Sequence, residues 1–289
     1  MIFLKKLFSP ITATLGFIQN YFKAMIFLLI LFLIFAPSSE QDLTPNNLQQ
    51  INLVGPIMEV SEVLEQIEKA SSNTNIKGVL FVVDSPGGAV APSIELAYAI
   101  KRLKMKKPVI VYAQGTIASG SYYASIWASE IIANPGSMVG SIGVIMQGAD
   151  LSELMSKIGI SSQTVQAGKY KRIGTPDRKW EPFEVNELNK VIQGTYDMFT
   201  KDVADARGLD IKKRDQFANA HIFTAQQAKD VGLIDSLGVS NDAKIKLISL
   251  SGVDSPVWNK EDRFDKIMKK LSATTAVTLS TYFPALVLK

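Results

Sequence analysis

The sequence has 289 residues, of which 47% are hydrophobic and 20% are charged, and its formal net charge is +4. This length allows one large domain or two small ones, and the modest charge, in short basic groups among acids, does not favour nucleic-acid binding. The absence of cysteine excludes disulfides, thiolate metal sites and a cysteine nucleophile, and the single histidine, His221, excludes a histidine-rich metal site.

An uninterrupted apolar run near the N-terminus predicts a membrane anchor. Residues 24–36 are all apolar, and the preceding residues 1–23 contain three lysines and no acidic residue. Because a bilayer span takes about 20 apolar residues, the span would start near residue 17, with Lys23 reaching back to the interface. The basic flank predicts that the N-terminus is cytoplasmic and that the bulk of the chain lies outside.

Three interpretations of this run compete: a cleaved signal peptide, an uncleaved signal anchor and a buried helix. We favour the anchor, because Ile34 stands where a cleavage site after Ala36 would need a small residue. Residues 37–50 are polar and contain proline, which predicts a linker. A globular domain is then expected at 51–250, followed by a C-terminal extension at 251–289.

Alternating strands and helices predict an α/β fold for the start of the domain. Continuous apolar runs are typical of buried parallel strands, and apolar residues spaced by three and four are typical of helices. These patterns predict strands at 51–55, 79–83 and 109–113, and helices at 60–70 and from Pro92 onward. Such alternation favours a mainly parallel sheet whose loops gather into a site at the carboxyl ends of the strands.

In the second half of the domain, the spacing of apolar residues predicts shorter elements and one long amphipathic helix. We expect strands at 131–133 and 163–166, a loop at 168–176, and helices at 151–158, 181–207, 225–233 and 241–250.

Ser119 is the first candidate for chemistry. It lies between the strand at 109–113, which Gly115 and Thr116 should end, and a helical segment at 122–128. Unpaired N–H groups at a helix start can stabilise the oxyanion that a serine nucleophile generates. Most serines in such small-residue turns, however, only allow tight packing.

A serine nucleophile also needs a base. The chain has no GxSxG motif, and His221 lies in an ordinary polar stretch, which makes it a poor candidate. A desolvated lysine can replace histidine, because burial disfavours the charged form. Lys169 and Lys171 lie in one loop, although two solvated lysines are the simpler interpretation.

The turn Asp84-Ser85-Pro86-Gly87-Gly88 is the second candidate. Paired glycines after a buried strand let backbone N–H groups approach a ligand closely. The turn could form an oxyanion hole, a phosphate cradle or only a tight turn. The sequence contains neither a Walker A motif nor GxGxxG, so nucleotide binding has little support.

Together these motifs resemble the signal peptide peptidase A family of membrane-anchored serine proteases. The resemblance rests on DSPGG, ASGSYYAS after PVIVYAQGTI, GSMVGSIGVIMQ, AGKYKRIGTP and FTAQQAKDVGLID, in that order, and covers about residues 51–250. It implies a Clp-protease/crotonase-like fold of ββα units, with a mainly parallel sheet preceded by a transmembrane helix.

Matched position by position, the resemblance gives roles to five residues. It implies that Ser119 is the nucleophile, that Lys171, 52 residues later, is the general base, and that Ser141 orients the lysine. The backbone N–H groups of Gly88 and Gly120 would form the oxyanion hole. Lys169, two residues before Lys171, does not match.

Two positions depart from the family pattern. Ser121 stands where the family usually has a second glycine, and we expect little effect because the residue is still small. Asp84 stands where the family usually has asparagine. A carboxylate facing the site would oppose the developing negative charge, so we expect Asp84 to face away.

The resemblance also implies partners and location. It implies no metal and no cofactor, peptide substrates such as remnant signal peptides and other membrane-associated or unfolded segments, and a single-pass protein of the bacterial inner membrane. Short family members form ring-like homo-oligomers, so Lys171 could serve the Ser119 of a neighbour. The alternatives are a related Ser–Lys protease of stomatin-like membrane proteins, a crotonase-fold acyl-CoA enzyme and a catalytically silent scaffold.

Overall fold

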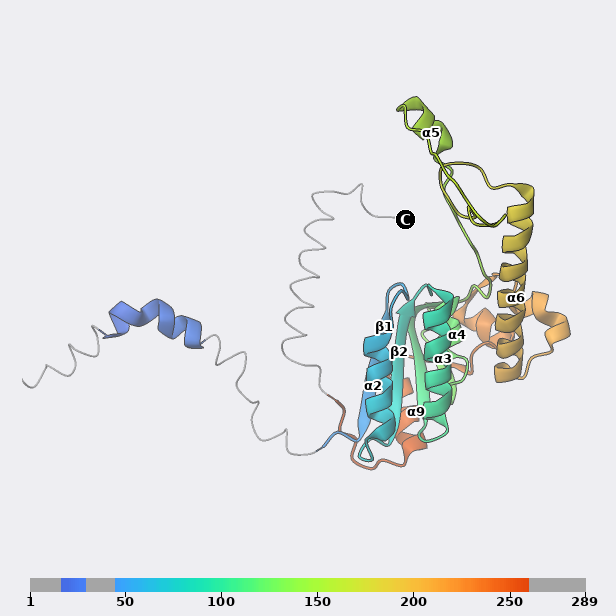
Figure 1. The fold of residues 1–289 in the computed structure, drawn as a ribbon. Coiled ribbons are helices and arrows are strands. Elements are labelled where there is room, and N and C mark those ends of the chain that lie inside the picture. Colours follow the sequence, from blue (N-terminus) through green and yellow to red (C-terminus); the bar gives the residue numbers. More distant parts are fainter. Residues whose placement is uncertain (1–16, 30–44, 260–289) are drawn as a thin grey trace, which may run out of the picture. The chain divides into compact units, whose positions relative to one another are not determined.

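The computed structural model describes residues 17–29 and 45–259 (Figure 1). The predicted cytoplasmic N-terminus and linker, and the C-terminal extension from residue 260, lie wholly or mostly outside the described residues. Residues 17–29 form a helix. Within residues 17–29 and 45–259, no helix combines the length and apolar character that crossing a membrane requires, so the predicted transmembrane helix remains a prediction.

Residues Asn46–Trp258 form one compact unit built on a mainly parallel sheet. Its central order is β1 (Leu48–Val54), β2 (Gly78–Ser85), β3 (Val109–Ala118), β4 (Glu130–Ala133) and β7 (Ser236–Leu237), all paired in parallel. The short β5 (Met138–Gly140) pairs in parallel with β3 beyond β4, and β6 (Ile222–Thr224) pairs antiparallel with β5. The predicted α/β class with a mainly parallel sheet is confirmed, and its assignment to the Clp-protease/crotonase group stays a prediction.

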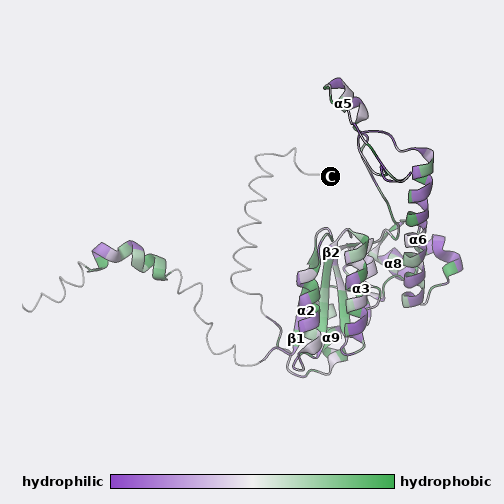
Figure 2. Ribbon diagram, in the orientation of Figure 1, coloured by the Kyte–Doolittle hydropathy of each residue, from purple (hydrophilic) through white to green (hydrophobic). Residues whose placement is uncertain are grey.

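Helices cover both faces of this sheet because successive strand residues point to opposite sides. On β2, Val79, Phe81 and Val83 face the core under α2 (Ser61–Ser72) and α3 (Val90–Lys104). Leu80 and Val82 face a second core under α9 (Ser240–Ser251). Figure 2 shows the strands as the hydrophobic centre between helices with hydrophilic outer faces.

The remaining helices of this unit lie between β3 and β7 in the sequence. They are α4 (Gly120–Ser125), α5 (Ser152–Lys157), α6 (Pro182–Arg207), the 3₁₀ turn η1 (Ile211–Lys213), α7 (Arg214–Phe217) and α8 (Ala225–Asp230). The long α6 begins with a capping box and a proline at its first turn, and it ends at Gly208 in the left-handed conformation.

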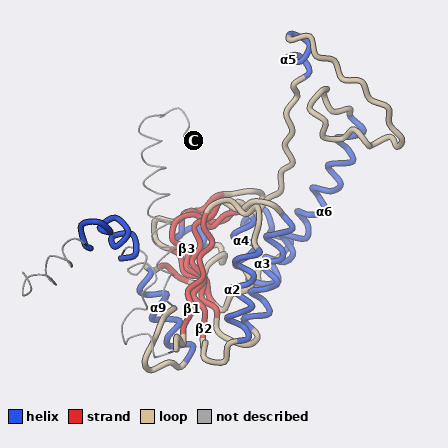
Figure 3. The backbone as a smooth tube through the Cα atoms, turned by 60° about the vertical axis from the view of Figure 1, so that its left-hand side comes forward, coloured by secondary structure: helices blue, strands red, loops and turns tan. Residues whose placement is uncertain are grey.

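The segment between β5 and α6, residues 143–181, is here called the arm. Figures 1 and 3 show that its outer part, with α5, extends away from the sheet beyond the start of α6. The strand predicted at 163–166 is wrong: these residues are exposed loop, with Val165 103% exposed, and no strand in the described part of the chain pairs with them. Alternating residues form a strand only where a partner supplies the hydrogen bonds.

Two boundaries also differ from the sequence-based expectations. β3 continues through Gly115 and Thr116, because the register shift between Val83 and Ser85 on β2 absorbs the irregularity. The compact unit extends beyond 51–250 at both ends. β1 starts at Leu48, which pairs with Trp258, so residues from the predicted linker and C-terminal extension belong to the fold.

Candidate active site

Ser119 occupies a strained turn between β3 and α4. Its φ of 52° lies in the left-handed region, which non-glycine residues seldom adopt. The turn is held on both sides: the Ser119 N–H donates to the Gly140 carbonyl (2.8 Å), and the Ser119 carbonyl accepts from the Tyr123 N–H (2.9 Å). Such strain persists only where the surrounding structure fixes it, and it is concentrated at functional sites.

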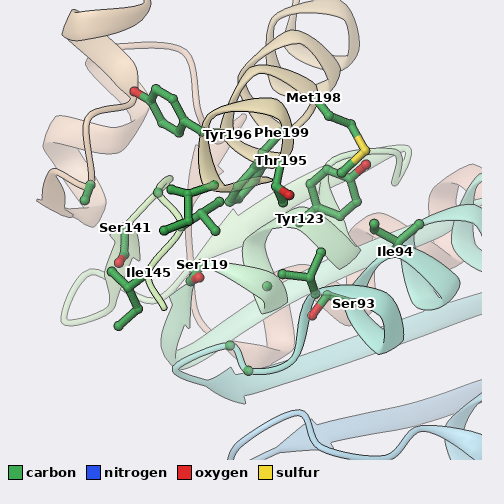
Figure 4. Close-up of a pocket in the computed structure, with 18 of the residues that line it drawn as sticks. Ser93, Ile94, Ser119, Tyr123, Ser141, Ile145, Thr195, Tyr196, Met198 and Phe199 are labelled. Carbon is green, nitrogen blue, oxygen red and sulfur yellow. The ribbon is translucent and has the colours of Figure 1, made fainter. Parts of the chain in front are cut away.

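Ser141 occupies a second strained position beside the first. Ala118 and Gly140 are register partners in the β3–β5 pairing, so Ser119 and Ser141 leave the sheet side by side. Ser141 has a φ of 50°, and its N–H donates to the carbonyl of His221 (2.7 Å). Figure 4 shows both serine side chains at the same pocket.

The glycine turn after β2 lies against the Ser119 turn. The Ile57 N–H donates to the Gly87 carbonyl (2.9 Å) and the Ala89 N–H to the Ile57 carbonyl (2.7 Å), so the Gly88 N–H points away from Ile57. A Cβ added to Gly120 would lie 3.3 Å from the Gly88 nitrogen. The N–H groups of Gly88 and Gly120 therefore lie close together, and neither has a hydrogen-bond acceptor within residues 17–29 and 45–259.

The pocket in front of these turns has a volume of about 590 Å³. Its walls are contributed by both turns, the start of α3, the residues after β5, one face of α6, and Asn219 and Ala220 before β6 (Figure 4). None of the described residues lining it is charged. Because burying an unpaired charge is costly, the pocket suits an apolar or neutral group.

The α6 wall is fixed by an aromatic contact. Tyr123 packs edge-on against Phe199, with ring centroids 4.9 Å apart, and its hydroxyl donates to the Asp202 carboxylate. Burial, reinforced by this hydrogen bond, raises the pKa of Tyr123. The sequence patterns identified α6 as amphipathic but did not show that Ile192, Met198 and Phe199 line a pocket. Their helical spacing is equally typical of a core face.

Lys171 lies outside this pocket. It is exposed in the arm, and its ammonium group has no hydrogen bond, ion pair or aromatic partner within the described residues. The neighbouring Lys169 differs, because its ammonium group sits over the Phe183 ring, 4.4 Å from the centroid. The structure of one chain thus brings Ser119, Ser141, Gly88 and Gly120 together and leaves Lys171 apart.

The loop that carries Lys171 is nevertheless tied to the start of α6. Arg178 forms a two-pronged ion pair with the buried Glu184 (2.8 and 2.5 Å), and Arg172 pairs with Asp177 (2.6 Å). The Arg178 guanidinium lowers the pKa of the Glu184 carboxyl. The loop therefore has a defined conformation.

Asp84 and His221 both direct their side chains elsewhere. An Asp84 carboxylate oxygen accepts from the Thr116 N–H (2.8 Å), and Gly115 leaves room for it, since a Cβ there would lie 2.5 Å from that oxygen. Asp84 does not line the pocket, as expected. The His221 side chain is exposed and does not line it either. Within the described ranges, no group of three or more acidic or histidine side chains is arranged to hold a metal ion.

The fold and the pocket define an α/β protein in which a strained serine turn and a glycine turn share one edge of a mainly parallel sheet. The chain belongs to the S49 family of peptidases, whose sequence model matches residues 101–254. The predicted relationship to the signal peptide peptidase A family is confirmed as membership of this peptidase family.

Individual relatives agree with this assignment. The candidate protease MJ0651 of Methanocaldococcus jannaschii is 44% identical over 194 residues, which are 67% of this chain and 61% of that protein. The chloroplastic serine protease SPPA of Arabidopsis thaliana is 31% identical over 185 residues, 64% of this chain and 27% of that protein. The chain spans only 53% to 64% of the length of three curated relatives that it matches, MJ0651 among them.

A solved structure described as the 1510-N membrane-bound stomatin-specific protease aligns with a TM-score of 0.48 and 16% identity, over 76% of this chain and all of that one. A likeness this distant does not bear on function.

Proposed function

We propose that the chain is a serine endopeptidase in which Ser119 is the nucleophile and Lys171 the general base. The observation that carries the proposal is the Ser119 turn: a strained serine beside two adjacent N–H groups, those of Gly88 and Gly120, that have no acceptor among the described residues. Preorganised donors of this kind stabilise the oxyanion of acyl transfer. Membership of a peptidase family supports a peptide bond as the substrate.

In the proposed mechanism, neutral Lys171 takes the hydroxyl proton of Ser119 while the Ser119 oxygen attacks the peptide carbonyl carbon. The carbonyl π electrons move to oxygen, and the N–H groups of Gly88 and Gly120 donate to this oxyanion. When the C–N bond breaks, Lys171 protonates the leaving amine. Water, deprotonated by Lys171, then releases the acyl group and regenerates Ser119, while Ser141 holds the lysine in position.

The base would come from a neighbouring copy in a ring-like homo-oligomer. The support is that Lys171 is exposed and outside the pocket of its own chain. The arm that carries it also exposes many large apolar side chains, as a surface that associates does. They are Ile145, Met146, Leu151, Leu154, Ile158, Ile160, Val165 and Tyr170. Burial in the neighbour's site would favour the neutral form that a base requires.

The substrates would be remnant signal peptides and other membrane-associated or unfolded peptides. The uncharged pocket lining supports apolar substrate side chains. The apolar run at 24–36, behind a basic flank, supports a single-pass anchor in the bacterial inner membrane with the protease domain outside. A Ser–Lys protease of stomatin-like proteins would use the same residues, and a substrate profile separates the two.

The test is labelling of the full-length chain, purified in mild detergent, with a serine-reactive fluorophosphonate. We expect labelling of wild type and Lys169→Ala, and its loss in Ser119→Ala and Lys171→Ala. Lys169→Ala is the matched control, because Lys169 sits over Phe183 two residues from the proposed base. Equal labelling of Ser119→Ala and wild type would refute the nucleophile, and equal labelling of Lys171→Ala would refute the base.

A further inference from the structure

One buried hydroxyl links the two turns of the site. Ser121 is fully buried at the start of α4, and its hydroxyl donates to the Ser85 carbonyl (2.7 Å). The same oxygen accepts from the Ala118 N–H (2.9 Å) and lies 2.9 Å from the Ala118 carbonyl. Ser85 directly precedes the Pro86-Gly87-Gly88 turn, and Ala118 directly precedes Ser119.

The hydroxyl adds a side-chain bridge to the backbone ladder between the strands. Ser85 on β2 is the register partner of Ile117 on β3, next to the register shift. In a parallel ladder, the N–H after Ile117 can donate straight to the Ser85 carbonyl. In addition, the Ala118 N–H donates to the Ser121 oxygen, and the Ser121 hydroxyl donates to the Ser85 carbonyl. The Ser121 hydroxyl therefore ties the end of β2 to the end of β3 at this point.

The separation of the strands here sets the separation of the two turns. The Ser85 hydroxyl accepts from the Gly87 N–H (3.2 Å), so the position of the glycine turn depends on the position of Ser85. The opposing contact is close, since a Cβ on Gly87 would lie 2.6 Å from the Gly120 nitrogen and 2.9 Å from the Ser119 Cβ. A small movement of Ser85 relative to Ala118 would therefore change the distance from the Gly88 N–H to the Ser119 oxygen.

We propose that Ser121 is a positioning residue for the oxyanion hole, acting through Ser85 and Ala118. This inference rests on the proposed function of Ser119. The size of Ser121 alone suggested little effect, whereas its hydroxyl joins the two turns. When the Ser119 oxygen bonds to the carbonyl carbon, the carbonyl π electrons move to oxygen, and donors must lie about 2.7–3.1 Å from that oxyanion. Misplaced donors weaken binding of the tetrahedral state more than binding of the uncleaved peptide.

The test compares Ser121→Ala with Ser125→Ala in the full-length chain. Ser125 is the matched control because it is equally buried in the same helix, and its hydroxyl donates to the Ser121 carbonyl one turn back (2.8 Å). The probes are Leu-Leu-norleucinal, whose aldehyde forms a tetrahedral adduct with a serine, and the corresponding peptide alcohol, which cannot. Thermal unfolding checks that both variants fold.

We expect Ser121→Ala to weaken aldehyde inhibition about 10- to 100-fold, which is at most the effect of losing a whole oxyanion donor. Binding of the alcohol should change less than about twofold. Ser125→Ala should change neither. Wild-type aldehyde affinity in Ser121→Ala, an equal loss for aldehyde and alcohol, or the same selective loss in Ser125→Ala would overturn the inference. If the aldehyde fails to inhibit wild type through Ser119, the proposed function itself is wrong. Failure of the proposed function is thus distinguished from failure of the role proposed for Ser121.

Discussion

A mixing experiment tests whether Ser119 and Lys171 act across a subunit boundary. Lys171 is exposed on the arm, outside the pocket that contains Ser119 and Ser141. If each site combines Ser119 of one copy with Lys171 of the next, an oligomer made from Ser119→Ala and Lys171→Ala chains contains some complete sites. A complete site pairs the intact serine of a Lys171→Ala chain with the intact lysine of a Ser119→Ala chain.

The expected yield follows from random assembly of identical interfaces. For a fraction f of Ser119→Ala chains, a site is complete with probability f(1−f), so equal mixing restores about a quarter of wild-type activity. If both residues of a site belonged to one chain, every chain would lack one of them, and no ratio would restore activity. The shared site therefore predicts restored activity in the mixtures, whereas a site within one chain predicts none at any ratio.

The assay uses the two variants with different affinity tags, co-expressed at several ratios and purified through both tags. Hydrolysis of a fluorogenic apolar peptide is measured for each ratio, and mass analysis verifies the mixed oligomers. We expect each variant alone to be inactive and the mixtures to follow f(1−f), with a maximum at equal amounts. Background activity at every ratio in verified mixed oligomers would refute a shared site.

Two further substitutions test the fold around Ser119. Tyr122 is fully buried and donates to the Leu233 carbonyl (2.7 Å), and burial raises its pKa. The folded state thus keeps a proton that the unfolded chain loses near pH 10, and the free energy of unfolding falls above that pH by about 1.4 kcal/mol per unit. Tyr122→Phe should make this slope shallower and leave the part due to Tyr123, whose pKa is also raised. It should also cost about 1–3 kcal/mol at pH 8, because the carbonyl loses its donor. An unchanged slope in denaturant titrations at pH 10–11 would contradict this. Gly88→Ala should lower the labelling rate by at least about 10²-fold, because its Cβ would lie 2.1 Å from the Ile57 carbonyl oxygen and displace the turn; a wild-type rate would contradict this.

The parts of the fold that follow periodic patterns could be predicted from the sequence. The apolar runs within β2 and β3 and the spacing of α6 predicted where those elements begin to within one residue, because burial of one face gives a regular apolar spacing. The short β6 and β7 were missed. Strands of two or three residues are defined by their partners, and their own sequences carry no period.

The site was predictable for a different reason in each of its parts. Ser119 and Gly88 lie in turns after buried strands, and the parallel-sheet rule brings such turns together. That Ser141 lies next to Ser119 depends on the pairing of β5 with β3, which no local pattern encodes. The role proposed for Ser121 depends on contacts of its hydroxyl with both Ser85 and Ala118, which neither its residue type nor its size could indicate.

The position of Lys171 raises the question of what the arm contacts, and a matched pair of substitutions addresses it. Ile160 lies in the arm and Ile245 on α9, and both are isoleucines with similar exposure, 53% and 56%. Introducing glutamate at either position should leave the isolated chain folded, because neither side chain is buried in it. If the arm forms the contact between copies, Ile160→Glu places a charge in an apolar interface, whereas Ile245→Glu leaves that contact intact.

We therefore expect Ile160→Glu to sediment as a smaller species and to lose fluorophosphonate labelling, because the Lys171 of a separated chain lies outside its own Ser119 pocket. Ile245→Glu should sediment and label as wild type does, and both variants should unfold within a few degrees of wild type. Wild-type assembly of Ile160→Glu, or equal dissociation of both variants, would show that the arm does not carry the contact. Dissociation of Ile160→Glu with full labelling would instead show that Ser119 is activated within its own chain, and would exclude Lys171 of a neighbour as its base.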